Sequence, residues 1–229
     1  MSFRKFWIKP SLVSDWGEAQ EERNAHWTVL FLDLILVAGV GACTEPVLKL
    51  GEEDPLSRIE AMEVADFILK FSLLYWLWLF FNEFSARIHD ESLVGSLYLF
   101  LFAFGVSWIG TGCTESVEDG FRSLAMGVCI GRLGLALLWI RPMVYIPRAR
   151  RHSSIMLAVA FLVLLIVAPV AALPQATPSY ARAALWSSVV LDIFTFVPLS
   201  WLGSDELPVH VEFADDRLKD GVMVVLGGK

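Results

Sequence analysis

Three ionisable residues lie deep within apolar runs of this sequence: Asp33, Arg132 and Asp192. An Asp near the middle of a membrane-spanning helix costs about 2.5–3.5 kcal/mol, which the surrounding Leu, Ile, Phe and Val residues can offset. Such a charge usually faces the interior of a helix bundle, where it meets a partner, a water cavity or an ion. We therefore expect these two acids and one base to form a buried charge cluster centred on Asp33.

Two interpretations of this cluster are open. Burial favours the protonated form of a carboxyl group, whereas a nearby guanidinium favours its ionised form. The cluster could therefore hold a proton whose affinity changes with conformation, which is what an ion or proton path requires. In the alternative interpretation, Arg132 neutralises Asp33 or Asp192 and locks the bundle.

Four further residues are candidates for the cytosolic mouth of such a path. His26 precedes Asp33 by seven residues, which places it two helical turns away on the same face. Glu83 lies at the end of an aromatic-rich run, and His210 and Arg217 follow the last long apolar run. The alternative for His26 is a position at the membrane interface, and the alternative for Glu83 is a solvated helix end.

The composition places the chain among membrane proteins. Hydrophobic residues make up 56% of its 229 residues and charged residues 19%, against about 45–50% and about 25% in soluble domains. A run of about 20 apolar residues is long enough to cross a bilayer. Six such runs, which begin near residues 26, 65, 93, 123, 153 and 180, predict an all-α polytopic transmembrane helix bundle.

The predicted organisation has three parts. Residues 1–25 form a cytosolic N-terminal segment, and residues 26–202 form a six-helix transmembrane bundle. Residues 203–229 form a polar cytosolic segment that ends in an apolar stretch too short to span. We interpret this stretch as the truncated start of a seventh helix. A polar loop is expected at residues 46–63 and another directly before the fourth run at residue 123.

The orientation follows from the distribution of Lys and Arg, which are enriched in cytoplasmic loops. The side that holds the N-terminus carries the larger set, so we predict a cytosolic N-terminus. That side has eleven of these residues (Arg4, Lys5, Lys9, Arg23, Arg87, Arg141, Arg148, Arg150, Arg151, Arg217 and Lys219), and the other side has five (Lys49, Arg58, Lys70, Arg122 and Arg182).

Several classes of function are not expected. The sequence has no GxSxG, P-loop or HExxH motif, so we expect no enzyme activity, no catalytic residue and no cofactor. The acidic residues behind the net charge of −7 gather in loops, so the lipid bilayer, and not nucleic acid, is the expected partner. The three cysteines form no CxxC pair, so no metal site is expected.

A short sequence pattern around two of the cysteines occurs twice. Cys43-Thr44-Glu45 recurs as Cys113-Thr114-Glu115, each after small residues at the end of an apolar run. The predicted topology places both copies outside, at the same membrane face. A disulfide or a metal contact between them is one interpretation, and a coincidence of small-residue helix ends is the other.

Packing signals occur in the second and fourth runs. Gly127 and Gly131 form a GxxxG pattern, which lets two helix backbones approach closely. This pattern and the truncated seventh helix favour an alternative function: a structural or regulatory subunit in a homo-oligomer or with a partner membrane subunit.

Trp76 and Trp78 are expected in an aromatic belt or in packing, and Lys70 is expected to snorkel to the interface.

The first run resembles the opening of the bacterial low temperature requirement A family. Members begin with an Arg-His-Ala-x-Trp pattern followed by Glu-Leu-Phe-Phe-Asp-Leu. The matching residues here are Arg23, Ala25, Trp27, Leu30, Phe31, Asp33 and Leu34, followed in order by Trp76, Trp78, Arg132, Asp192, Pro208, His210, Arg217 and Val225-Leu226-Gly227.

This resemblance spans nearly the whole chain and implies a multipass membrane fold. The chain departs from the family at Asn24, Val29, Phe213 and Gly228, and it stops where the family continues through further helices. The resemblance implies a compartment and a fold, but no established biochemical activity. The expectation of a transporter or channel therefore depends on the buried charges.

Overall fold

The computed structural model describes residues 8–12, 27–53, 61–90, 92–173 and 176–206. Within these ranges, β1 (Ser11–Leu12) pairs antiparallel with β2 (Ile88–His89), and a 3-10 helix, η4 (Pro147–Ala149), joins the fourth and fifth long helices. The long helices are α1 (Trp27–Glu53), α2 (Ala61–Arg87), α3 (Leu93–Cys113), α4 (Val117–Tyr145), α5 (Arg150–Ala172) and α6 (Pro178–Glu206).

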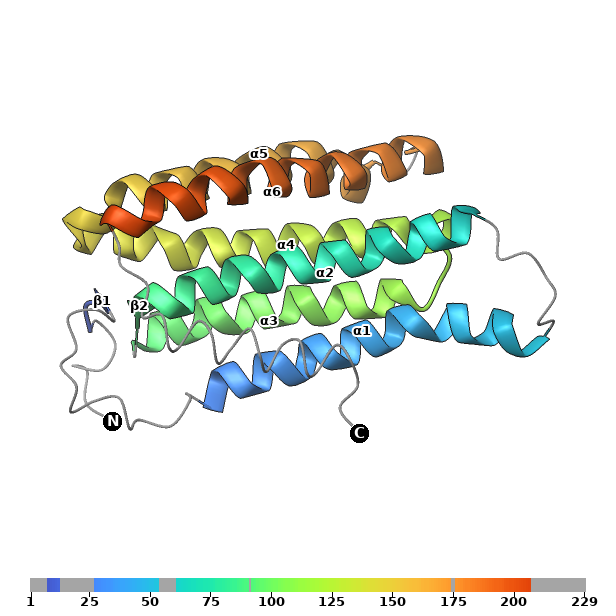
Figure 1. Ribbon diagram of the computed structural model, residues 1–229, viewed down its shortest axis with the longest axis horizontal. Coiled ribbons are helices and arrows are strands. Elements are labelled where there is room, and N and C mark those ends of the chain that lie inside the picture. Colours follow the sequence, from blue (N-terminus) through green and yellow to red (C-terminus); the bar gives the residue numbers. More distant parts are fainter. Residues whose placement is uncertain (1–7, 13–26, 54–60, 91, 174–175, 207–229) are drawn as a thin grey trace.

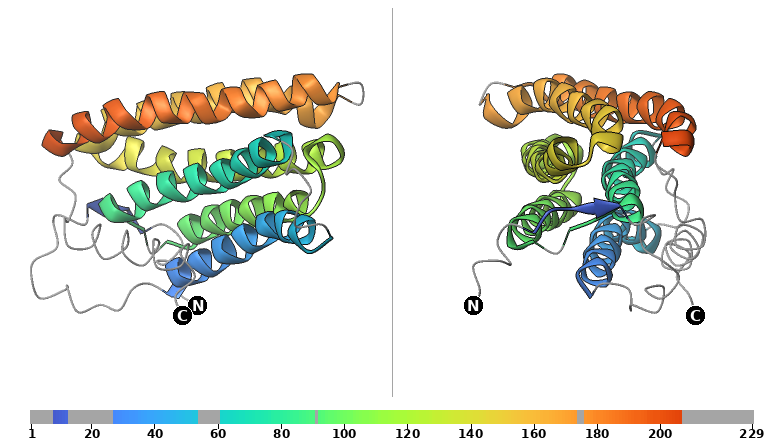
Figure 2. Two further views of the ribbon diagram at one scale, coloured as in Figure 1. Left: turned by 45° about the vertical axis from the view of Figure 1, so that its right-hand side comes forward. Right: turned by 90° about the vertical axis from the view of Figure 1, so that its left-hand side faces the viewer.

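The long helices run side by side along the longest axis of the molecule (Figure 1). α5 and α6 form one side of the bundle, α2 and α4 lie beneath them, and α1 and α3 form the opposite side (Figures 1 and 2). α4 packs most extensively against α3 and α5, whereas α1 packs against α3 and α2. α2 therefore lies between α1 and α6.

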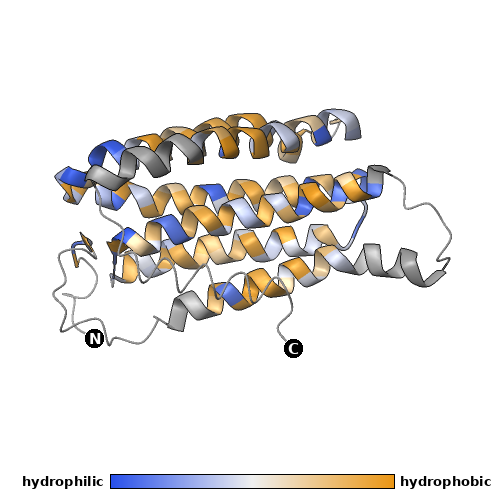
Figure 3. Ribbon diagram, viewed as in Figure 1, coloured by the Kyte–Doolittle hydropathy of each residue, from blue (hydrophilic) through white to orange (hydrophobic). Residues whose placement is uncertain are grey.

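Four segments are long and apolar enough to cross a membrane: Glu63–Arg87, Leu93–Cys113, Val117–Tyr145 and Pro147–Ala172. In α1, a shorter apolar stretch, Phe31–Thr44, is found among the described residues. Figure 3 shows that apolar residues cover most of the helices and that many hydrophilic residues lie near the helix ends. The all-α membrane bundle is thus confirmed, with four of its predicted spans.

Two predicted loops are shorter than expected. α1 continues past Pro46 to Glu53, so the prediction of a loop over residues 46–53 is wrong; the Leu, Lys and Glu residues there are good helix formers. α4 begins at Val117 because the Ser116 side chain accepts a 3.2 Å hydrogen bond from the backbone N–H of Asp119, which caps the helix. The predicted start of a seventh helix, residues 221–229, lies outside the described residues.

Glycines allow α3 and α4 to pack with their backbones in contact. A Cβ added to Gly105 of α3 would collide with the backbone of Gly131, and one added to Gly127 would lie 2.6 Å from the backbone nitrogen of Ile109. A Cβ added to Gly131 itself would point toward α2 and lie 3.2 Å from the Cδ1 of Leu77. The GxxxG face is therefore occupied by helices of the same chain and is not a free surface for a second subunit.

Candidate functional site

Arg132 and Asp192 form an ion pair in the interior of the bundle. Arg132 lies near the middle of α4 and Asp192 near the middle of α6, and their side chains are 3% and 2% exposed. The Arg132 Nη2 donates a hydrogen bond to Asp192 Oδ2. The guanidinium carbon also lies 4.9 Å from the centroid of the Phe80 ring, a cation–π contact to α2. One guanidinium therefore joins three helices.

The pair leaves polar atoms unsatisfied. Among the described residues, neither Asp192 Oδ1 nor Arg132 Nε has a hydrogen-bond partner, although both atoms are buried. The nearby Ser188 hydroxyl donates instead to the Leu185 carbonyl, at 2.7 Å. Buried polar atoms are normally hydrogen-bonded because leaving one unpaired costs free energy. An uncoordinated carboxylate oxygen in this position can accept a proton or coordinate a small cation.

Aromatic rings lie beside the ion pair. Phe196, one turn after Asp192 on α6, packs against Trp76 and Phe80 of α2, with ring centroids 5.7 and 5.9 Å apart. Rings in this arrangement exclude water from the neighbouring charges and lower the local dielectric, which strengthens the electrostatic interaction. The predicted role of Trp76 in packing agrees with this position.

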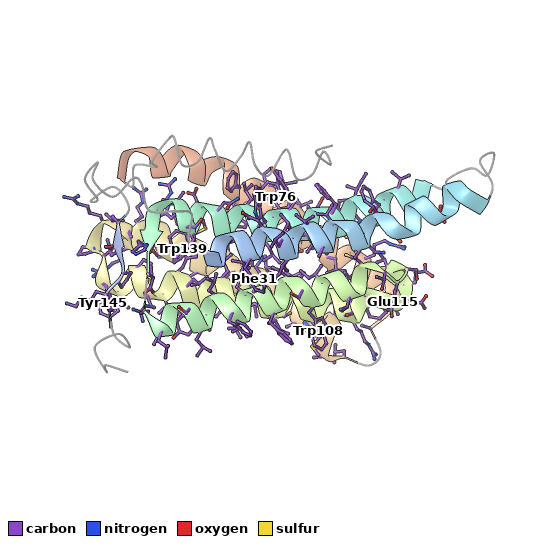
Figure 4. The ribbon with its side chains drawn as sticks, turned by 90° about the horizontal axis from the view of Figure 1, so that it is seen from below. Phe31, Trp76, Trp108, Glu115, Trp139 and Tyr145 are labelled. Carbon is purple, nitrogen blue, oxygen red and sulfur yellow. The ribbon has the colours of Figure 1, made fainter. Side chains whose placement is uncertain are left out.

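Asp33 lies apart from the ion pair and has a different partner. Its Oδ1 accepts a 3.0 Å hydrogen bond from Nε1 of Trp78, which is buried on α2. Asp33 itself is only part-buried, and Figure 4 shows Phe31, two residues earlier on α1, in the central part of the bundle. Trp78 thus has a specific polar role beyond the expected aromatic packing.

The expectation of one cluster centred on Asp33 requires correction. Arg132 contacts Asp192, but among the described residues no ion pair joins Asp33 to either of them. The physical reason is the position of α2, which lies between α1 and α6 and supplies the indole that satisfies Asp33. The three predicted charges form a buried pair and a separate carboxylate on the other side of α2.

A second charged group occupies the end of α2. Glu83 Oε1 forms an ion pair with Nη2 of Arg87, four residues later, at 2.7 Å, and it lies 3.5 Å from Nε2 of His152 on α5. Trp139 of α4 packs against the His152 ring at 5.1 Å, toward the end of the bundle that Figure 4 marks with Tyr145. Glu83 is thus mostly buried at this end. The other predicted mouth residues, His26, His210 and Arg217, lie outside the described residues.

Lys70 has specific partners at the end of α3. It is 4% exposed, and its Nζ donates to the backbone carbonyls of Cys113, at 3.0 Å, and Glu115, at 2.5 Å. A cation at the C-terminus of a helix satisfies carbonyls that lack helical partners and interacts favourably with the helix dipole. Lys70 therefore caps α3, and its amino group reaches the connection between α3 and α4 at one end of the bundle.

Sequence reasoning also missed two tertiary ion pairs. Arg182 of α6 binds Asp66 of α2 through two hydrogen bonds of 3.1 and 3.2 Å. Arg141 of α4 lies 2.8 Å from Asp90 and donates to the carbonyl of Ile8, which fixes the strand segment to the bundle. These partners are far apart in the sequence, and no local spacing identifies them. No group of three metal-binding side chains occurs in the described ranges.

Apolar helices of membrane-spanning length, packed around buried ion pairs, define a multipass integral membrane protein. The family model described as "Bacterial low temperature requirement A protein (LtrA)" matches residues 24–229. The chain belongs to this family, as its motifs predict. Comparison with curated proteins and with solved structures gave no match.

Proposed function

We propose that this membrane protein is an ion- or proton-coupled transporter or channel in which Arg132 and Asp192 form the central switch. The observation that supports the proposal is the buried ion pair between α4 and α6 with an uncoordinated Asp192 Oδ1. Buried ionisable residues inside a membrane bundle are expensive and typically serve ion or proton paths.

The proposed switch works through charge neutralisation. A proton or a cation that binds Asp192 Oδ1 reduces the attraction between the carboxylate and Arg132. The contact between α4 and α6 then weakens, because the guanidinium no longer faces a full negative charge. Binding is thereby coupled to the separation of two helices, which is what alternating access or gating requires.

Other charged residues have supporting roles in this proposal. Glu83 and His152 form the described part of the mouth at the cytosolic end, and His26, His210 and Arg217 are proposed to complete it. Asp33 is proposed as a second carboxylate at intermediate depth, held by Trp78. The mechanism involves binding and conformational change without covalent catalysis, so the proposed protein is not an enzyme.

The proposal includes six spans and a cytosolic N-terminus. α1 has 27 residues and α6 has 29, so at a rise of 1.5 Å per residue they extend about 40 and about 44 Å. Both lengths exceed the roughly 30 Å hydrocarbon core of a bilayer. The N-terminal orientation is supported by the excess of Lys and Arg on that side of the chain.

Charge movement through purified protein in liposomes tests the proposed function. A membrane-potential dye and an internal pH dye report net ion and proton movement under imposed proton, sodium or potassium gradients. Asp192→Asn should lower the rate at least tenfold. Asp66→Asn is the matched control, because Asp66 also pairs with an arginine of α6 but lies less buried, and it should retain the rate. Equal rates for wild type, D192N and empty liposomes would reject the transport function.

A second candidate is a non-transporting structural or regulatory membrane subunit. The direct contact between Arg132 and Asp192 favours it, because a self-neutralised pair can stabilise a bundle without binding an ion. This candidate predicts no flux above empty liposomes for the wild type. It also predicts co-purification of a second membrane subunit or of a second copy of the chain.

A further inference from the structure

We propose that Cys43 and Cys113 form an intramolecular disulfide that links α1 to α3. The two Sγ atoms lie 2.7 Å apart, and the residues are separated by 70 positions in the sequence. Both side chains are buried, at 1% and 0% exposure. The cysteines of the two Cys-Thr-Glu copies therefore face one another across the α1–α3 contact.

The helix backbones approach closely at this point. A Cβ added to Gly110 of α3 would lie 3.5 Å from the Cα of Gly39 of α1, about one turn before each cysteine. Small residues at facing positions bring two helix axes together. A disulfide requires such proximity, since its two Cα atoms are usually about 4.4–6.8 Å apart.

A bridging metal ion fits this geometry less well than a sulfur–sulfur bond. Two thiolates that bind one tetrahedral zinc ion at about 2.3 Å each would hold their sulfurs about 3.8 Å apart. The observed separation is about 1 Å shorter.

The chemistry needs an oxidant outside the cytosol. The two thiols release two protons and two electrons as the Sγ–Sγ bond forms, and the disulfide of an extracytoplasmic thiol oxidoreductase accepts them and becomes a dithiol. Disulfides persist in such oxidising compartments. The inference thus depends on the proposed orientation, which places this end of the bundle outside. Because both sulfurs are buried, the bond forms while α1 and α3 assemble and is then shielded from reductants.

Differential thiol labelling of the full chain in bacterial membranes tests this inference. Free thiols are blocked with N-ethylmaleimide in SDS, the sample is reduced, and the newly released thiols are labelled with polyethylene glycol maleimide. The wild type should gain two labels at monomer mobility on a gel. Cys129→Ser should also gain two, since Cys129 has no role in the bond, whereas Cys43→Ser and Cys113→Ser should gain none.

Either of two results overturns the disulfide: no label on the wild type, or two labels that persist in Cys43→Ser. A reductant that is present during the melt reaches the bond as the helices separate, so it should lower the melting temperature of the wild type by several degrees and leave that of Cys43→Ser unchanged. An activity reporter fused to the N-terminus tests the orientation separately. The label count is independent of ion flux, so failure of the disulfide and failure of the transport proposal are distinguishable.

Discussion

The guanidinium of Arg132 on α4 is paired with the carboxylate of Asp192 on α6 inside the bundle, and it also lies over the ring of Phe80 on α2. Removing one member of a buried ion pair leaves an uncompensated charge, which costs about 3–5 kcal/mol. Removing both members together leaves none. Comparing the single variants with the double variant therefore distinguishes a pair that only stabilises the bundle from a pair whose charge is needed for function.

The hydrogen bond between Trp78 and Asp33 should contribute to stability. Trp78→Phe leaves the carboxylate without its indole donor, so we expect a loss of roughly 1–2 kcal/mol in the free energy of unfolding. Trp76→Phe is the control, because Trp76 takes part in ring contacts that Phe can partly retain. Denaturation in mixed micelles, followed by circular dichroism, measures both. Equal losses in the two variants would contradict a specific role for this bond.

The contact between α3 and α4 should not tolerate even one methyl group. Gly105→Ala places a Cβ on the backbone of Gly131, and Gly127→Ala places one against Ile109. Overpacking of this kind costs about 1–3 kcal/mol or more, so both variants should melt at a lower temperature than the wild type.

Gly41→Ala is the matched control for these substitutions. An added Cβ at Gly41 has no atom within 4 Å among the described residues, and Ala is the better helix former by about 1 kcal/mol. This variant should melt at the wild-type temperature or above it. A fall as large as that of Gly105→Ala would show that the loss comes from the helix backbone and not from packing.

The cap that Lys70 provides for α3 predicts a further loss. Lys70→Met keeps much of the apolar stem but leaves the carbonyls of Cys113 and Glu115 without their donor, which should cost about 1–3 kcal/mol. Lys9→Met, at an exposed position, should change the stability little. Thermal unfolding in detergent compares the two variants, and an unaffected Lys70→Met would refute the capping role.

Much of the fold could be predicted from the sequence because the membrane imposes a simple rule of length and hydropathy. The charge-free run at residues 93–112 corresponds closely to α3 (Leu93–Cys113). The helix boundaries that depend on local hydrogen bonds were predicted less accurately. The Ser116 cap, for example, starts α4 six residues before the predicted run. Hydropathy alone cannot detect such a cap when the capped turn is polar.

The candidate site was only partly predictable. Hydropathy identified Arg132 and Asp192 as buried charges, whereas Asp33 is only part-buried. Hydropathy could not assign partners, because pairing depends on which helices are neighbours. The position of α2 separates Asp33 from the other two, and the pairing of Trp78 with Asp33 spans 45 residues. Likewise, Lys70 resembles an interfacial lysine in sequence, and only the position of the α3 terminus shows that it is a cap.

A cycle of Arg132→Gln, Asp192→Asn and the double variant, measured for both stability and ion flux in liposomes, distinguishes a functional switch from a structural lock. Each single variant should lose stability, and the double variant should recover most of it, since no unpaired charge is left. If the pair is the switch, flux should remain at least tenfold below wild type in the folded double variant. Recovery of wild-type flux together with stability would contradict the role of the pair as a switch and show that it only stabilises the bundle.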